Sequence, residues 1–137
     1  MRGQEEAVSW VRRNLPHDSR IVIDDYMWYD LHSPAGSASF PNAIYYWNVE
    51  YDPWLRRRVL ADNWRNVDYV ITTPQMYHDV AQQPFPVVAT AIRHSVLVRE
   101  FNTGNWPVQI RRIDPRVSVP LASSSTGASE PACMTAV

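Results

Sequence analysis

The chain has 137 residues, of which 45% are hydrophobic and 20% charged, and its formal net charge at pH 7 is −1. This length fits one domain with a substantial core, and the balanced charge offers no basic surface for nucleic acid or anionic lipid. The single cysteine excludes a disulfide or a cysteine-based zinc site within the chain. No apolar run approaches the roughly 20 residues that span a bilayer and no signal peptide is recognisable, so the chain as given is expected to be soluble.

The first half of the chain alternates between helix and strand patterns. Residues 4–15 carry apolar side chains at helical spacing, which predicts an amphipathic helix ended by Pro16. Residues 21–23 form a short apolar run typical of a strand buried on both faces. Residues 32–41 are rich in proline, serine and glycine, which predicts an exposed loop. Residues 44–47 are β-branched or aromatic and predict a second strand.

The second half continues this alternation. Residues 53–66 begin with a proline behind a potential Asp cap and are predicted to be helical. Residues 69–73 predict a third strand, and residues 75–82 a short helix. The longest helical pattern covers residues 87–101, whose apolar side chains recur on one face. Residues 108–113 alternate between apolar and polar, which predicts a half-exposed last strand near the edge of the sheet.

Strands separated by helices indicate right-handed crossovers and a parallel sheet. We therefore predict an α/β fold, a small three-layer sandwich with a mostly parallel sheet of about four strands and helices on both faces. Residues 1–116 are assigned to one α/β domain and residues 117–137 to a disordered tail, because the tail lacks apolar periodicity. No glycine-rich phosphate loop or metalloprotease motif is present, and no cofactor is expected.

The stretch most typical of a ligand site, residues 24–32, follows the first predicted strand. The residues just past a strand's carboxyl end face the crevice in which open parallel sheets bind ligands. Aromatic faces stack on the C–H surfaces of a sugar while carboxylates accept hydrogen bonds from its hydroxyls, so the stretch predicts a carbohydrate site with residues 32–41 as a movable flap. The candidate substrate-binding residues are Asp24, Asp25, Tyr26, Trp28, Tyr29, Asp30, His32, Asn48 and Thr73.

Two simpler interpretations apply to the same residues. In the first, Asp24 or Asp25 serves only as the N-cap of a following helix, since Asp is a preferred capping residue; in the second, Trp28 belongs to the core. Asp30 and His32 lie two positions apart and would bind a metal only if another element supplied a third ligand, so no metal site is expected.

Several segments together resemble a known type of domain. The first two are AVSWVRRNLP (residues 7–16) and IVIDDYMWYDLH (residues 21–32). The others lie at residues 42–47, 51–53, 64–73 and 91–101. Over roughly residues 4–113 the chain resembles the soluble carboxyl-terminal domain of bacterial GT-C membrane glycosyltransferases, in the protein-mannosyltransferase and aminoarabinose-transferase group.

The resemblance implies a non-catalytic accessory domain on the extracytoplasmic face of the cell membrane. Its partners would be a glycan or glycosyl acceptor and the membrane-embedded part of a parent enzyme that uses a polyprenyl-phosphate sugar. The catalytic acid of such enzymes lies in a loop between membrane spans that nothing here matches, so no catalytic residue is assigned. Two alternatives remain: a stand-alone domain that binds carbohydrate or another small molecule, and a small hydrolase or transferase that uses Asp24, Asp25 and Asp30.

Overall fold

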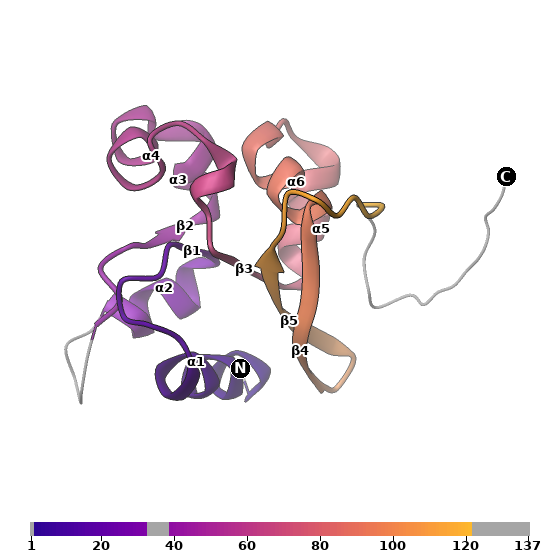
Figure 1. Ribbon diagram of the computed structural model, residues 1–137. Coiled ribbons are helices and arrows are strands. Elements are labelled where there is room, and N and C mark those ends of the chain that lie inside the picture. The colour runs from indigo at the N-terminus through magenta and orange to yellow at the C-terminus, as the bar shows by residue number, and fades with distance from the viewer. Residues whose placement is uncertain (1, 33–38, 122–137) are drawn as a thin grey trace, which may run out of the picture.

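A mixed five-stranded sheet forms the centre of the protein, of which the computed structural model describes residues 2–32 and 39–121. Most of the helices lie between the strands in sequence (Figure 1). In chain order the elements are α1 (Arg2–Asn14), β1 (Ile21–Ile23), α2 (Asp25–His32), β2 (Ala43–Tyr45), α3 (Tyr46–Tyr51), α4 (Pro53–Leu60), the 3-10 helix η1 (Trp64–Asn66), β3 (Tyr69–Thr72), α5 (Pro74–Gln82), α6 (Pro86–Arg93), β4 (Ser95–Thr103) and β5 (Trp106–Ile113).

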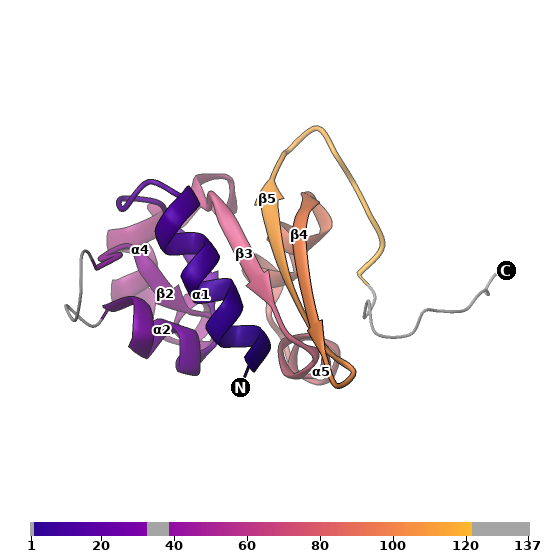
Figure 2. The ribbon, with the colours of Figure 1, turned by 90° about the horizontal axis from the view of Figure 1, so that it is seen from below.

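The strands follow the order β2-β1-β3-β5-β4 across the sheet. Strand β1 pairs in parallel with both β2 and β3, with Val22 opposite Ile44 on one side and Val70 on the other. Strand β5 runs antiparallel to β3 and β4, so a hairpin extends the parallel part of the sheet (Figure 2). The α/β class is thus confirmed, whereas the expectation of a mostly parallel sheet of about four strands missed this hairpin.

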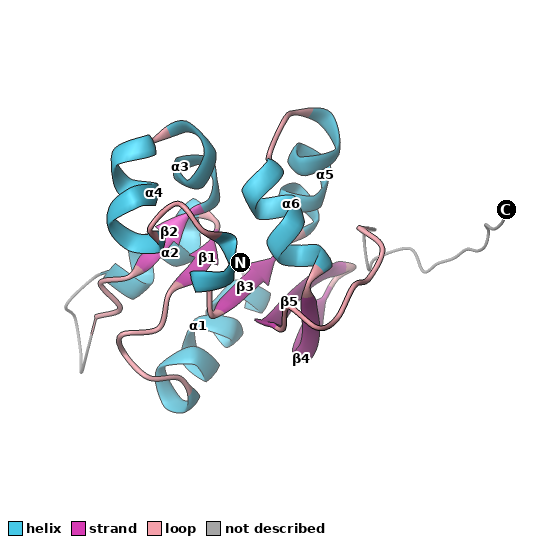
Figure 3. Ribbon diagram, turned by 45° about the horizontal axis from the view of Figure 1, so that its top comes forward, coloured by secondary structure: helices cyan, strands magenta, loops and turns pink. Residues whose placement is uncertain are grey.

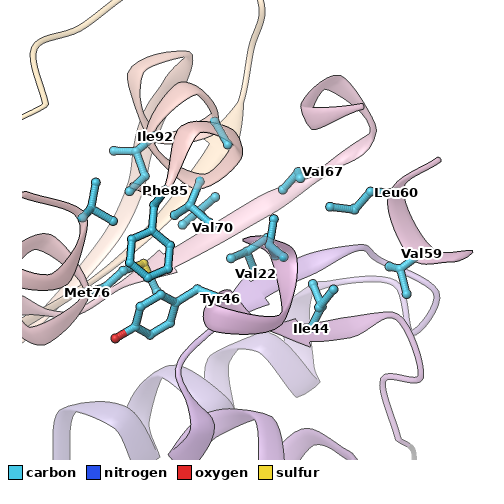
Figure 4. Packing of buried hydrophobic residues seen from close by; sticks show 14 of the residues in the cluster. Val22, Ile44, Tyr46, Val59, Leu60, Val67, Val70, Met76, Phe85 and Ile92 are labelled. Carbon is cyan, nitrogen blue, oxygen red and sulfur yellow. The ribbon is translucent and has the colours of Figure 1, made fainter. Parts of the chain in front are cut away.

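Two hydrophobic clusters pack against opposite faces of the sheet. Ile21 and Ile23 contribute to one cluster, which also holds the apolar faces of α1 and α2. Val22 points the other way into a second cluster (Figure 4), which is covered by α3, α4, α5 and α6 (Figure 3). This alternation explains why all three residues of β1 are buried, as the apolar run predicted. Helices therefore lie on both faces of the sheet.

The predicted helix at residues 87–101 is wrong in its second half. Helix α6 ends at Arg93, and β4 begins two residues later, at Ser95. Strand β4 leads through Gly104 and Asn105, both at φ +62°, into β5. Two consecutive positive φ angles are typical of a two-residue hairpin turn. Because β4 covers its outer side, β5 is an interior strand with residues 107–110 buried, and the expected place near the edge belongs to β4.

Two further element boundaries differ from the sequence prediction. Strand β2 ends at Tyr45, and Tyr46 already begins α3, so Tyr46 and Trp47 are helical and not extended. The predicted helix at residues 53–66 is divided, because Ala61 adopts a left-handed conformation that ends α4 before η1 begins. Helix α2 occupies a segment for which no helix was predicted, between the first two strands. The elements α1, β1, β3, α5 and β5 lie within about two residues of their predicted positions.

The last described residues pack on the domain. The amide of Val119 donates to the carbonyl oxygen of Arg93 at 2.8 Å, and Leu121 packs against the cluster under α3 to α6. Of the flap predicted at residues 32–41, residues 33–38 lie outside the described residues, and so do residues 122–137 of the tail predicted at residues 117–137. The described start of that tail, by contrast, packs on the domain. Among the helices that the structure describes, none has the length and apolar character needed to cross a membrane.

Candidate binding crevice

A crevice opens where the chain leaves β1 and β3 toward opposite faces of the sheet. After β1, helix α2 packs beside α1 through Met27 and Leu31. After β3, helix α5 packs on the other face through Met76 and Val80. Neighbouring parallel strands whose connections diverge in this way leave an opening at their carboxyl ends, which is the usual ligand site of open α/β sheets. The structure has a hollow of about 450 Å³ at this edge.

Carboxylates, amides and aromatic rings form the walls of this hollow, which we call the crevice. Of the ten lining residues, three are aspartates, four are aromatic and none is basic, so the walls offer hydrogen-bond acceptors and stacking surfaces but no site for an anion. The lining residues are Gln4, Asp24, Asp25, Tyr45, Tyr46, Trp47, Thr73, Gln75, Asp79 and Trp106.

Asp24 lies between the crevice and the start of α2. Its Oδ1 accepts a hydrogen bond from the backbone N–H of Met27 at 2.8 Å, so the capping role considered for this residue is real. Its Oδ2 accepts from Nε2 of Gln4 at 2.5 Å. Burial, with only 8% of the residue exposed, is the main cause that raises the pKa of the Asp24 carboxyl. The neighbouring charge of Asp25 raises this pKa further, while the two hydrogen bonds oppose the shift.

A hydrogen-bond network joins two walls of the crevice. The hydroxyl of Tyr46, at the start of α3, donates to Oδ2 of Asp79 on α5, and Oδ1 of Asp79 accepts from Nε2 of Gln75 at 3.0 Å. Burial is the main cause that raises the pKa of Tyr46, and the hydrogen bond to Asp79 adds to it. Thr73 lies on the same wall, directly before α5. Its Oγ1 accepts a hydrogen bond from the N–H of Met76 at 3.2 Å and so caps α5.

The remaining wall comes from two segments that are distant in sequence, the start of α1 and the start of β5. Gly3 brings α1 close to β5: a Cβ at this position would lie 3.2 Å from Cγ2 of Val108 and 3.6 Å from the carbonyl oxygen of Trp106. Gln4 and Trp106 therefore line the crevice together, although about 100 positions separate them. Two of their atoms, Oε1 of Gln4 and Nε1 of Trp106, are buried without a hydrogen-bond partner in the described part of the chain.

The structure brings together only some of the candidate residues. Asp24, Asp25 and Thr73 line the crevice, at the carboxyl ends of β1 and β3 as expected. Asn48, predicted to lie at the end of the second strand, is instead the third residue of α3 and does not line the crevice.

The next four candidates lie further along α2, and their side chains are directed away from the crevice. The Trp28 ring packs on the His32 ring with centroids 4.4 Å apart and contributes to the cluster that contains α1. His32 Nε2 lies 2.9 Å from the carbonyl oxygen of Ala43. Tyr29 is 74% exposed, and the backbone oxygen of Asp30 accepts from Arg12. None of these side chains lines the crevice.

Tyr26, the remaining candidate, lies on the exposed surface of α2. Its hydroxyl donates to Oε2 of Glu5 on α1 at 3.4 Å, so it is directed along the surface between the two helices. It is not among the residues that line the crevice.

The sequence analysis did not predict seven of the ten residues that line the crevice. Tyr45 and Trp47 flank the carboxyl end of β2, and a correct boundary of that strand would have placed them at this edge. Gln75 and Asp79 stand four residues apart on α5, a spacing that puts them on one helix face directly after Thr73. Tyr46 was assigned to a strand interior, and neither Gln4 nor Trp106 has a local signal. The seven are Gln4, Tyr45, Tyr46, Trp47, Gln75, Asp79 and Trp106.

A second hollow of about 430 Å³ lies at the opposite edge of the sheet, beside the amino ends of β1 and β3. It is bordered by the exposed side chains of Arg20, Arg65 and Arg112, with Asp18 and Asp68 among them. The two aspartates thus compensate two of the three positive charges, and the hollow lies away from the carboxyl ends where open sheets bind ligands. Within the described residues, no group of three or more His, Cys, Asp or Glu side chains is placed to hold a metal ion.

Comparison with known proteins adds no relative: the chain matches no protein-family model, no curated protein and no solved structure. The function is therefore argued from the chemistry of the crevice.

Proposed function

We propose that this domain binds carbohydrate in the crevice and acts without catalysing a reaction itself. The observation that carries the proposal is the composition of the crevice walls, which combine three aspartates and four aromatic residues with no basic side chain. Carboxylates accept hydrogen bonds from sugar hydroxyls, and aromatic rings stack on the apolar C–H faces of a sugar. The 450 Å³ hollow is within the size range of small-ligand sites.

The exposure of the walls suits this role. Asp25 is exposed to solvent, and the rings of Tyr45, Trp47 and Trp106 are half-buried, so their free faces are available to a ligand. Trp47 is also held in place, because its ring packs edge-on against Phe85 with centroids 4.8 Å apart. A pre-formed aromatic wall lowers the entropy cost of binding.

We further propose that the domain is an extracytoplasmic accessory part of a membrane glycosyltransferase that uses a polyprenyl-phosphate sugar. The resemblance of residues 4–113 to the carboxyl-terminal domains of such enzymes supports this assignment. The crevice would then hold the glycan or glycosyl acceptor beside the membrane-embedded part of the parent enzyme. The complete reading frame tests this part of the proposal, which requires membrane spans encoded in the same frame.

Carbohydrate binding is tested by titrating the ¹⁵N-labelled domain with methyl glycosides of glucose, galactose and mannose, and with disaccharides. We expect chemical-shift changes centred on Tyr45, Trp47, Gln75 and Trp106, and loss of affinity in Trp47→Ala. Trp54→Ala is the matched control, because Trp54 is 65% exposed on α4 and does not line the crevice.

Shift changes centred on α4, or no binding of any sugar, would contradict carbohydrate binding in the crevice. The non-catalytic role has its own test. The isolated domain should neither hydrolyse nor transfer a polyprenyl-phosphate sugar, and turnover that disappears in Asp25→Ala would show instead that the crevice is an active site.

A further inference from the structure

We propose that the aromatic wall of the crevice continues onto Tyr51, and that the domain therefore binds an oligosaccharide whose second unit stacks on this ring. This inference rests on the proposed function and specifies the size class of the ligand. Its starting point is an aromatic ring outside the crevice. Tyr51 is the last residue of α3, and 51% of it is exposed to solvent.

Tyr51 adjoins the crevice through Trp47. The two residues lie four positions apart on α3, a spacing that places them on one face of the helix. Their rings pack against each other, with centroids 5.6 Å apart and planes inclined by 32°. Trp47 lines the crevice and Tyr51 does not, so the exposed ring of Tyr51 lies next to the end of the aromatic wall. A ligand longer than one sugar unit is therefore able to contact both rings.

A buried ring supports this aromatic pair from below. Phe85, which is 2% exposed, packs edge-on against Tyr51 at 85° with centroids 5.7 Å apart, and it meets Trp47 in the same manner at 81°. The hydroxyl of Tyr51 also donates to the carbonyl oxygen of Pro84 at 2.9 Å. Because the Tyr51 ring is fixed at two points before a ligand arrives, little entropy is lost when a ligand stacks on it.

These contacts distinguish Tyr51 from an aromatic residue that is merely exposed. Its hydroxyl already donates to the protein, so the ring offers a ligand mainly its apolar faces, which suit the C–H surface of a sugar. Trp54 on α4 is more exposed, at 65%, but its ring lies under the Arg58 guanidinium, 5.1 Å from the ring centroid. Among the described residues Trp54 has no ring contact with the crevice wall, which makes it a suitable control.

The test compares the affinities of methyl glucoside, galactoside and mannoside with those of the α- and β-linked disaccharides of the same sugars. For wild-type protein we expect at least one disaccharide to bind about 5- to 15-fold more tightly than its monosaccharide, the gain that covering one face of an aromatic ring produces. In Tyr51→Ala this ratio should fall to about 1–2, whereas Tyr51→Phe, which keeps the ring, should retain most of it. Trp54→Ala should keep the wild-type ratio.

A measurement on wild-type protein keeps the test valid if Tyr51→Ala fails to fold. The aromatic ¹H–¹³C resonances of Tyr51 should shift more with the disaccharide than with its monosaccharide, and those of Trp54 should stay in place with both. If monosaccharides bind but no disaccharide gains more than about twofold, or if the gain persists without the Tyr51 ring, the inference is wrong while carbohydrate binding stands. If neither monosaccharide nor disaccharide binds, the proposed function fails and this inference fails with it.

Discussion

Replacing Tyr46 by Phe tests the link between the two walls of the crevice. The substitution keeps the ring, which is 3% exposed and packs at 5.6 Å between centroids on Phe85, and it removes only the hydroxyl that donates to Asp79. A hydrogen bond to a charged group contributes about 1.5–3 kcal/mol to stability. Asp79 is half-buried and keeps its bond from Gln75, so water and that amide recover part of the loss. We therefore expect a destabilisation of about 1–2 kcal/mol.

The assay is urea unfolding at pH 7 together with a thermal scan. For a domain of this size each kcal/mol lowers Tm by about 3–5 °C, so the expected shift is about 3–10 °C. Tyr45→Phe is the matched control, because the neighbouring Tyr45 is half-buried and its ring contacts Tyr46, yet no hydrogen bond of its hydroxyl is found among the described residues. A loss below about 0.5 kcal/mol for Tyr46→Phe, or an equal loss in the control, would refute the reasoning.

The Tyr46 hydroxyl also makes the stability of the wild-type protein depend on pH, and Tyr46→Phe should lack this dependence. Burial and the Asp79 carboxylate raise the pKa of Tyr46 above its ordinary value of 10.0, so the folded state keeps the hydroxyl proton at a pH where the unfolded state loses it. The stabilisation is complete below pH 10 and decreases as the pH rises further. Between pH 10 and 11 the unfolding free energy of wild type should fall more steeply than that of Tyr46→Phe, and equal slopes would contradict the assignment.

Three other substitutions test individual contacts. Burial raises the pKa of Asp24, so the stabilising effect of the protonated carboxyl is complete below the ordinary value of 3.8 and is lost as the pH rises through the folded pKa. In urea unfolding, Asp24→Asn should therefore gain stability relative to wild type from pH 4 to pH 7. A relative loss would argue against burial as the dominant cause of the shift. Thr73→Ala removes the cap of α5 and should cost about 1 kcal/mol in urea unfolding, whereas Thr73→Ser should cost much less. Gly3→Val forces a side chain against Val108 and should lower stability by about 1–3 kcal/mol, a loss that a thermal scan would detect.

Local patterns in the sequence were sufficient for the parallel part of the sheet. The apolar run at Ile21–Ile23 is buried on both faces because neighbouring strands and two helical layers surround it, and this is the environment that such a run indicates. The prediction that Asp24 and Thr73 meet at one edge follows from the shared direction of the parallel strands, and the structure places both at the crevice. Geometry common to all such sheets was enough for this step.

Helical spacing alone misled the prediction for residues 87–101. Val88, Ala91 and Ile92 do form the buried face of α6, but the pattern continues by coincidence into β4. Two signals pointed to the hairpin: the β-branched and aliphatic run Val96-Leu97-Val98, and a two-residue Gly104-Asn105 turn before an alternating strand.

Half of the crevice depends on contacts between distant parts of the chain. Trp106 and Gln4 line the same crevice because α1 packs on the β4–β5 hairpin, and no short-range pattern encodes that packing. The aromatic residues of α2 show the opposite problem. Their closeness in sequence to Asp24 suggested a shared site, but Met27 and Leu31 occupy the core and rotate Tyr26 and Tyr29 toward solvent.

The position of β4 at the edge of the sheet has a consequence for how the protein behaves at high concentration. An exposed edge strand can pair with a strand of another molecule, and Leu97 and Val98 are 49% and 42% exposed on this one. The pairing register with β5 shifts between Leu97 and Arg99, and the charged residues Arg99 and Glu100 follow directly. Such a bulge twists an edge strand and interrupts the regular spacing that an incoming strand requires. We therefore expect the irregularity to oppose aggregation through β4.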